Sequence, residues 1–435
     1  MLHLCSLPPP LLLDVFRYAV EDSDFLPLLL ICRQLRGVAE DVIYRDITQN
    51  LLYTPDPCRR LHLLFRTLFH RRDLASRVRS LTIRCARDIL SPRRESHTAE
   101  RSFITELDLP SPDGWVGGCA NNFTEAYVTL IMLITPNLLH MHIESGDMSD
   151  AFPDMFHPVV LDSFPGERRF RNLRTLTYGP GPARQVADTT LARAIVPFFY
   201  LPQLRELRLT GLFGRFDGWL DRERPTTGIQ GLSLVGAGLD FAYIDEILAA
   251  CPDLKYLTIG VKQQHDSIAT AYGHIGRGLL NVQSSIEEIN ISFGESEGPA
   301  PFHPPGSNIR PLCSLAEFPA LWDVAIPIVA YLGGRPREAS ALESFVPRRL
   351  ERLRFYDDIW AVEPEDAELY WSTLFGHLAG LLRRKAEVAP GFYEVSFFIH
   401  PSEQYYDFGE GIDGIQELAD RADVAVRYFG VADDE

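Results

Sequence analysis

A spaced apolar motif recurs along most of this chain and constrains its fold more than any other feature. The motif is an apolar residue, two residues of any kind, a second apolar residue, one residue of any kind and a third apolar residue. Because the last two apolar positions alternate as in a half-buried strand, each copy predicts one short β-strand. After the first gap, the copies start about 25 to 35 residues apart. They occupy residues 78–83, 138–143, 173–178, 204–209, 229–234, 254–259, 286–291, 321–326 and 350–355.

Segments with helical periodicity separate several of these copies. They span residues 190–199, 240–250, 266–282 and 365–384. Prolines at positions 202, 252 and 319 stand where the end of a helix is expected. Each unit therefore consists of strand, loop and helix, and no unit can bury its apolar face without a neighbour. The competing fold is an open α/β sheet with helices on both faces, which does not require the recurrent lead-in to each strand.

The repeating unit is similar to the leucine-rich repeat family, in an irregular form with long repeats. The resemblance implies an α/β repeat solenoid over residues 78–430, with parallel strands on the concave face and helices on the convex face. Residues 51–77 are expected to form a linker helix, centred on 59–72, and a last strand is expected at 395–399. Polar or glycine- and proline-rich inserts are expected at about 91–122, 146–171 and 294–307, and residues 431–435 are an acidic tail.

The first 50 residues follow a different pattern, a succession of short apolar helices. Pro8, Pro9 and Pro10 stop any earlier helix and suit the first turn of a new one. After an acidic break, Asp24 is a suitable N-cap for a second helix, which is apolar on nearly all sides over residues 28–35. A helix of this kind must be buried from more than one side. Its cover therefore includes either the following domain or another protein.

This segment resembles the F-box, the adaptor-binding module of SCF-type ubiquitin ligases. The residues that carry the resemblance are Leu7, Pro8, Leu11, Leu12, Val15, Leu28, Ile31, Cys32 and Arg33, followed by Val38, Ala39 and Ile43-Tyr44-Arg45 in a third helix. Two positions depart from the family pattern, because Pro10 replaces a usual acidic residue and Leu35 a frequent Trp. The resemblance implies that residues 1–50 form a three-helix module in which the first nine of these residues bind a Skp-type adaptor. That adaptor in turn binds a cullin scaffold.

A second surface is expected along the strands, where residues between the inward-facing positions point to the opposite face. These positions are polar and mixed in charge, with arginines and aromatic residues gathered in the last units. Arginine and aromatic side chains are enriched in binding hot spots, so we expect a substrate protein, unidentified by the sequence, to dock here. The residues expected to bind it are Glu206, Arg208, Tyr256, Arg352, Arg354, Tyr356 and Phe398. A solvated sheet face with no partner is the alternative.

Charge and cysteine content exclude several classes of function. The chain has 42 basic and 59 acidic residues, for a net charge of −17, which argues against binding to nucleic acid or to an anionic membrane. Its longest apolar run, near 126–134, is much shorter than a membrane span. The seven cysteines are scattered and form no Cys-x-x-Cys pair. We therefore expect reduced thiols in an intracellular protein of the cytoplasm or nucleus.

Motifs of enzymes are weak or missing, so we expect neither catalysis, nor a cofactor, nor a metal. His140 and His142 lie on one face of a strand with Glu144 nearby, but exposed histidines on a solvated face are common. The isolated Gly236-Ala237-Gly238 is a weak dinucleotide signal and is expected to be a turn into the next helix.

Two functions remain. The chain is either the substrate-recognition subunit of an SCF-type ligase or a non-catalytic repeat scaffold. In the scaffold, a degenerate F-box only caps the solenoid.

Overall fold

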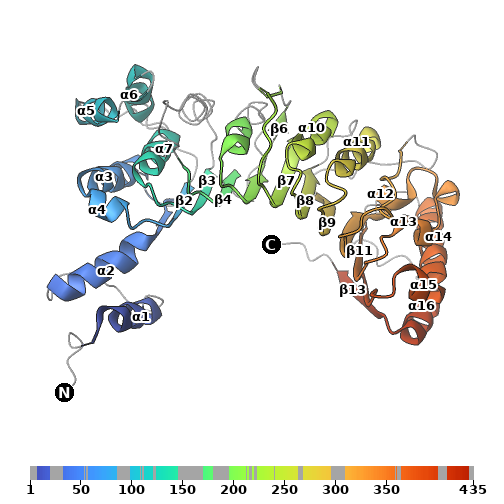
Figure 1. The fold of residues 1–435 in the computed structure, drawn as a ribbon. Coiled ribbons are helices and arrows are strands. Elements are labelled where there is room, and N and C mark those ends of the chain that lie inside the picture. Colours follow the sequence, from blue (N-terminus) through green and yellow to red (C-terminus); the bar gives the residue numbers. More distant parts are fainter. Residues whose placement is uncertain are drawn as a thin grey trace. The chain divides into compact units, whose positions relative to one another are not determined.

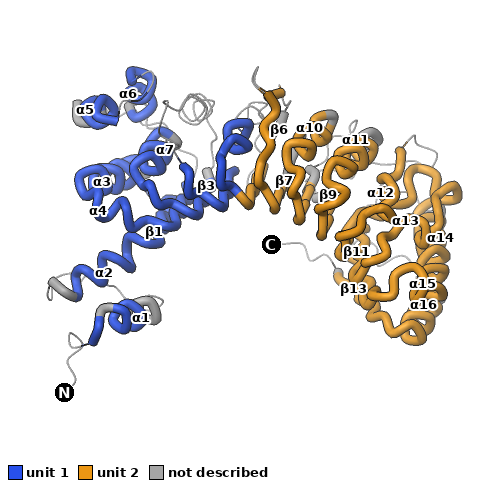
Figure 2. Tube along the Cα trace, in the orientation of Figure 1, with its two compact units in different colours: residues 1–186, 193–204 blue, residues 187–192, 205–435 orange. Residues whose placement is uncertain are grey.

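The computed structural model describes residues 7–19, 33–52, 54, 57–85, 98–107, 109, 112–120, 124–145, 170–179, 195–211, 213–214, 218–219, 223–239, 241–262, 268–294, 309–357, 359, 364–399 and 409–430. Within these residues the chain forms two compact units (Figure 2). Unit 1 comprises residues 1–186 and 193–204, and unit 2 comprises residues 187–192 and 205–435.

Unit 1 contains a parallel sheet whose strands pair in chain order. Its strands are β1 (Asp46–Asn50), β2 (Ser80–Cys85), β3 (His140–Ser145) and β4 (Thr175–Gly179). Its helices are α1 (Pro9–Ala19), α2 (Arg33–Arg45), α3 (Pro57–His70), α4 (Arg72–Ala75), α5 (Thr98–Glu106), α6 (Pro112–Ala120), α7 (Thr124–Ile134) and the 3-10 helix η3 (Val196–Tyr200). Helices α3 and α7 pack together behind the sheet (Figure 1).

Unit 2 repeats the same plan with a longer parallel sheet. Its strands are β5 (Glu206–Thr210), β6 (Phe213–Gly214), β7 (Gly231–Leu239), β8 (Tyr256–Lys262), β9 (Glu288–Gly294), β10 (Asp323–Pro327), β11 (Arg352–Tyr356), β12 (Glu394–Ile399) and β13 (Ala425–Gly430). Its helices are η4 (Phe241–Tyr243), α10 (Ile244–Ala249), α11 (Ile268–Leu280), α12 (Ile328–Leu332), η5 (Pro336–Glu338), α13 (Leu342–Phe345), α14 (Pro364–Arg383), α15 (Lys385–Val388) and α16 (Gly409–Ala422). Strand β6 pairs only with β7, and the other strands pair in chain order.

The recurrent apolar motif explains why these strands pair in register. In β5, for example, Leu207 and Leu209 are fully buried, and the same holds for their counterparts in the neighbouring strands. Burying one such side chain contributes about 1.5–3 kcal/mol. The ladder also extends one residue ahead of each strand, since the amide of Lys255 donates to the carbonyl of Gln230 and that of Glu287 to the carbonyl of Lys255, both at 2.8 Å. The strand predictions are confirmed, and this parallel α/β architecture is consistent with a solenoid-like repeat.

Other expectations about the repeat region need correction. Strands β1, β6 and β13 lie outside the predicted set, so each unit contains described strands that the motif did not predict. The helix predicted over 59–72 is confirmed as α3, but its Leu61, Phe65 and Leu68 are completely buried, so it is part of the packed helical layer and not only a linker. The insert at 91–122 contains α5 and α6, in which Trp115 and Cys119 are buried.

Two smaller predictions also differ from the structure. The glycines near 236–238 lie inside β7, beside an irregularity in its pairing with β8, and do not form a turn. The helix expected at 190–199 is described only from residue 195, where η3 contains Pro197. Most of the inserts at 146–171 and 294–307, and the tail 431–435, lie outside the described residues. In the described part of the chain, no helix is both long and apolar enough to cross a membrane.

Candidate functional site: the N-terminal helical module

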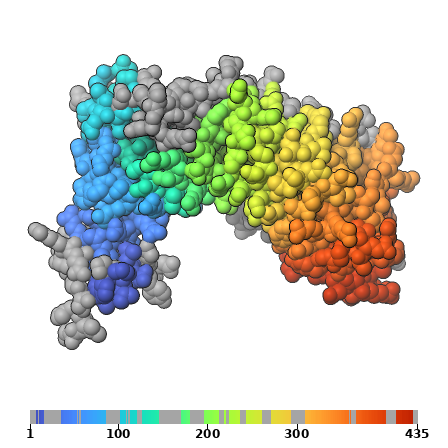
Figure 3. Space-filling view, in the orientation of Figure 1, coloured from blue at the N-terminus to red at the C-terminus, as the bar shows by residue number. Residues whose placement is uncertain are grey.

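Helix α1 presents two different faces along its length. Its first turn contains Pro9 and Pro10, whose missing amides leave no helical hydrogen bond unmade at that position. The first helical bond runs from the amide of Leu12 to the carbonyl of Pro8 at 3.1 Å. Leu12 is fully buried, whereas Leu11 is 52% and Val15 43% exposed. The space-filling view shows α1 at the surface, in dark blue (Figure 3).

The buried face of α1 packs on α2 and gives the module its own core. Leu12, Leu35 and Val38 form this core, and four half-buried apolar residues pack around it. These four are Leu7, Leu13, Val42 and Ile43. Leu35 is 2% exposed, so the leucine at this position is a core residue and not part of a surface. We refer to residues 7–19 and 33–45 as the helical module.

The structure divides the predicted adaptor-binding residues into three groups. Pro8, Leu11 and Val15 are exposed and lie three and four residues apart, which places them on one face of α1. Leu12 belongs to the core of the module and is unavailable for direct binding, whereas Leu7 is half-buried and packs against that core. The remaining positions are not placed: Leu28, Ile31 and Cys32 lie outside the described residues, and Arg33 begins α2 with its side chain undescribed.

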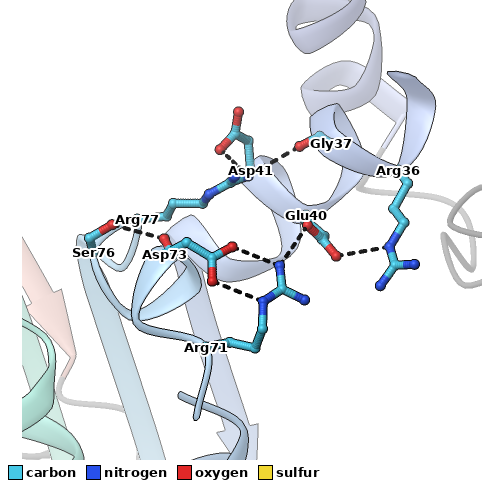
Figure 4. A network of polar contacts seen from close by, with 8 residues as sticks. All are labelled: Arg36, Gly37, Glu40, Asp41, Arg71, Asp73, Ser76 and Arg77. Atoms are coloured by element: carbon cyan, nitrogen blue, oxygen red, sulfur yellow. Dashed lines mark hydrogen bonds and ion pairs between the residues drawn. The ribbon is translucent and has the colours of Figure 1, made fainter. Parts of the chain in front are cut away.

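A polar clamp holds α2 against the turn between α3 and α4 and the segment that follows it (Figure 4). The guanidinium of Arg77 donates to Asp41 Oδ1 at 2.6 Å and to the carbonyl of Gly37 at 3.2 Å. Arg71 donates to Glu40 Oε2 at 3.4 Å. Since α2 also runs directly into β1, the module is joined to the sheet of unit 1 by continuous secondary structure as well as by ion pairs.

Charges around the clamp are mutually satisfied. Arg71 makes two further hydrogen bonds to Asp73, at 2.8 and 2.7 Å, and these lower the pKa of Asp73 to about 2. Arg36 pairs with Glu40 at 3.1 Å from the neighbouring turn of α2. Burial raises the pKa of Tyr44, with the charge of Glu40 acting in the same direction. These side chains serve attachment of the module, whereas the exposed face of α1 carries no part of the clamp.

The second predicted surface lies on the polar face of the unit 2 sheet. Asp323 on this face determines what its arginines do. Asp323 is fully buried and forms ion pairs with both predicted anchor arginines. Its Oδ2 lies 2.6 Å from Arg352 Nη2, and its Oδ1 accepts a hydrogen bond from Arg354 Nη2 at 2.7 Å. The two arginines therefore neutralise a buried carboxylate on β10 and do not act as free anchors.

Aromatic side chains continue this polar face toward the ends of the last strands. Tyr356 and Phe398 lie with ring centroids 5.1 Å apart, and Phe398 stacks on Phe429 at 5.0 Å. The Tyr356 hydroxyl donates to Asn290 Oδ1 at 3.1 Å, and burial raises the pKa of this tyrosine. Phe429 is an exposed member that the sequence reasoning missed. The β-branched and aromatic residues in the Ala-Val-Arg-Tyr-Phe sequence of β13 were the signal that could have found it.

The other predicted substrate residues form a separate group. Glu206 and Tyr256 are exposed in one cross-strand row, since Glu206 is in register with Gly231 and Gly231 with Tyr256. Arg208 is exposed on the same face of β5. Strands β9 and β10 separate this group from β11, so the seven predicted residues do not make one continuous cluster.

The histidines on β3 have ordinary partners. His140 Nδ1 lies 2.8 Å from Thr175 Oγ1, and His142 Nε2 lies 3.6 Å from Glu144. Glu144 also pairs with Arg84 at 3.1 Å. Among the described residues, no group of three or more His, Cys, Asp or Glu side chains has an arrangement suited to a metal ion.

Comparison with known families agrees with the module that these helices define. Residues 4–50 match the family model described as F-box-like. The chain therefore carries an F-box-like domain, which covers α1, α2 and β1. A comparison with curated proteins finds no matching sequence.

Proposed function

We propose that this chain is the substrate-recognition subunit of an SCF-type ubiquitin ligase. One observation carries the proposal. The F-box-like domain exposes an apolar row on α1, formed by Pro8, Leu11 and Val15, while the opposite face of α1 packs in the core of the helical module. Exposed apolar groups gathered on one face are typical of an interaction site. The occupant that suits an F-box-like domain is a Skp-type adaptor, which links the chain to a cullin scaffold.

The proposed role requires no chemistry from this chain. In this role, the repeat units hold a substrate protein while the adaptor connects them to the ubiquitin-transferring machinery. This proximity raises the effective concentration of target lysines near that machinery. The polar face of unit 2 supports the substrate half of this proposal. Tyr356, Phe398 and Phe429 form a continuous aromatic strip there. We place such a subunit in the cytoplasm or nucleus.

The strength of adaptor binding by α1 can be approximated from exposure. About half of Leu11 and of Val15 remains accessible, and full burial of such a side chain is worth about 1.5–3 kcal/mol. Covering the exposed halves of both therefore contributes about 2 kcal/mol, or roughly a thirtyfold change in Kd. Charged replacements weaken binding further, since they place a carboxylate in the interface.

The test is a binding measurement between the purified chain and a purified Skp-type adaptor. We expect wild type to bind and the L11D/V15D variant to lose binding at least thirtyfold. Leu280→Asp is the matched control, because Leu280 is 54% exposed on α11, far along the chain from the module. Circular dichroism and thermal melting verify that each variant is folded. Equal loss in the control, or no binding by wild type, would reject the proposal.

A repeat scaffold without a ligase partner is the second candidate. The clamp of Arg71 and Arg77 supports it, because these contacts attach the module to unit 1 next to its first strand, β1. In the scaffold reading, wild type does not bind the adaptor, and removal of residues 1–45 exposes β1 and lowers solubility. The same binding measurement therefore separates the two functions.

A further inference from the structure

A polar cavity lies at the edge of unit 1 where turns lead into its strands. Its volume is about 390 Å³. It is lined by Leu139, Arg171, Asn172, Arg174, Pro202 and Gln203. The lining contains two guanidinium groups and two primary amides but no carboxylate, in a chain whose net charge is −17. We call it the rim cavity.

The two arginines of the rim cavity are unpaired. Neither the side chain of Arg171 nor that of Arg174 has a hydrogen-bond or ion-pair partner within the residues that the structure describes. Arg79 and Arg205, which like Arg174 immediately precede a strand, behave differently. Arg79 donates to the carbonyl of Asn137 at 3.2 Å, and Arg205 to that of Gly228 at 3.0 Å, so each closes the turn of the next unit. At Arg174 this bond is not made, and the cavity lies in its place.

The backbone that presents these arginines is held in position. Phe170 has a φ of 56°, a conformation that bulky side chains rarely adopt, and it directly precedes Arg171. The side-chain amide of Asn172 donates to the carbonyl of Pro136 at 2.9 Å, and the amide of Arg174 donates to the carbonyl of Leu139 at 2.8 Å. Leu173 between them is buried. The turn is therefore preorganised, which lowers the entropic penalty of binding a ligand.

We propose that the rim cavity binds a phosphate ester. Two planar guanidinium forks supply paired N–H donors to the oxygens of a dianion, which is the geometry that arginine offers to phosphate. The Gln203 side chain adds an amide donor to the same lining. A cavity of about 390 Å³ exceeds the size of a phosphate group, and Leu139 and Pro202 supply apolar wall for the group that carries it. This site is independent of adaptor binding by the helical module.

The test uses isothermal titration calorimetry and ³¹P NMR line broadening with three probes at constant ionic strength. The probes are inorganic phosphate, a neutral peptide that contains one phosphoserine, and a sugar phosphate. Constant ionic strength matters because exposed charges are screened by salt. The variants are R171A/R174A and the matched control R60A/R66A, which removes two exposed arginines of α3 and the same amount of charge.

We expect wild type and the control to bind at least one ester probe, and R171A/R174A to bind it at least tenfold more weakly, since hydrogen bonds to charged groups carry this much affinity. Stronger binding of the phosphopeptide than of the sugar phosphate identifies a protein ligand, and the opposite order identifies a small metabolite. The proposal is overturned if no probe binds wild type at millimolar concentration, or if both double variants weaken binding equally. Adaptor binding by R171A/R174A is expected to remain at the wild-type level.

Discussion

Replacing Asp323 by Asn tests whether the arginines of the polar face are structural. The carboxylate is fully buried, and its two oxygens lie 2.6 and 2.7 Å from the guanidiniums of Arg352 and Arg354. Asparagine keeps the shape but leaves both cations without a counter-charge. Breaking a buried ion pair costs about 3–5 kcal/mol. Because the side chains of the two arginines are 32% and 26% exposed, water partly compensates their charges, so we expect a loss near the lower limit, about 3 kcal/mol.

The assay is urea unfolding followed by tryptophan fluorescence. Trp322 is a local reporter, since the guanidinium carbon of Arg352 lies 4.8 Å from its ring centroid. With an m-value of about 3 kcal/mol/M, a loss of this size lowers the midpoint by about 1 M. Glu387→Gln is the control, because its partner Arg384 and Glu387 itself are mostly exposed, and pairs of this kind contribute less than about 1 kcal/mol. If the unfolding midpoint of Asp323→Asn equalled that of the control, the structural role of Asp323, Arg352 and Arg354 would be refuted.

Four other predictions follow from packing and from titration. Gly278→Ala should destabilise the fold by about 1–3 kcal/mol, because the new Cβ would lie 2.9 Å from Leu248 Cδ1. Gly273→Ala on the same helix meets no atom within 4 Å and should stabilise by about 0.5–1 kcal/mol in thermal melts. Burial raises the pKa of Cys251 to about 11, so iodoacetamide at pH 8 should alkylate it only after urea is added, as read by intact mass. Burial lowers the pKa of His377, so the unfolded state binds the proton first and stability should fall as pH drops below 6.5. That fall should be smaller in His377→Gln.

The repeating strands were predictable because each one carries its full pattern of burial in its own sequence. The β1 strand, Asp-Ile-Thr-Gln-Asn, contains one apolar residue, Ile47, and depends on pairing with β2 for its conformation. The periodicity of a segment cannot reveal which strand it will pair with. The glycine-rich segment of α6 is similar, since its helix is selected by burial of Trp115 and Cys119 and opposed by local propensity.

The candidate sites were predictable in part. The exposed row on α1 follows from helical spacing, but the sequence could not distinguish Leu11, at the surface, from Leu12, in the core. Alternation placed Arg352 and Arg354 on the correct face of the sheet. Their engagement with Asp323 depends on cross-strand register, in which Asp323 is directly opposite Arg352. The free arginines of the rim cavity carry no local sequence signal, since Arg79 and Arg205 occupy equivalent positions and are bonded.

Because α2 continues directly into β1, the register of β1 in the sheet fixes the orientation of α2 relative to that sheet. Arg45 ends the helix, Asp46 starts the strand, and Asp46 is in register with Ser80. One residue inserted at this junction would rotate the helix by about 100° relative to the strand or shift every side chain of β1 to the other face. The exposed row of Pro8, Leu11 and Val15 on α1 therefore has a defined orientation relative to the sheet of unit 1. A different orientation of this row would require changes both at the junction between α2 and β1 and in the clamp of Arg71 and Arg77.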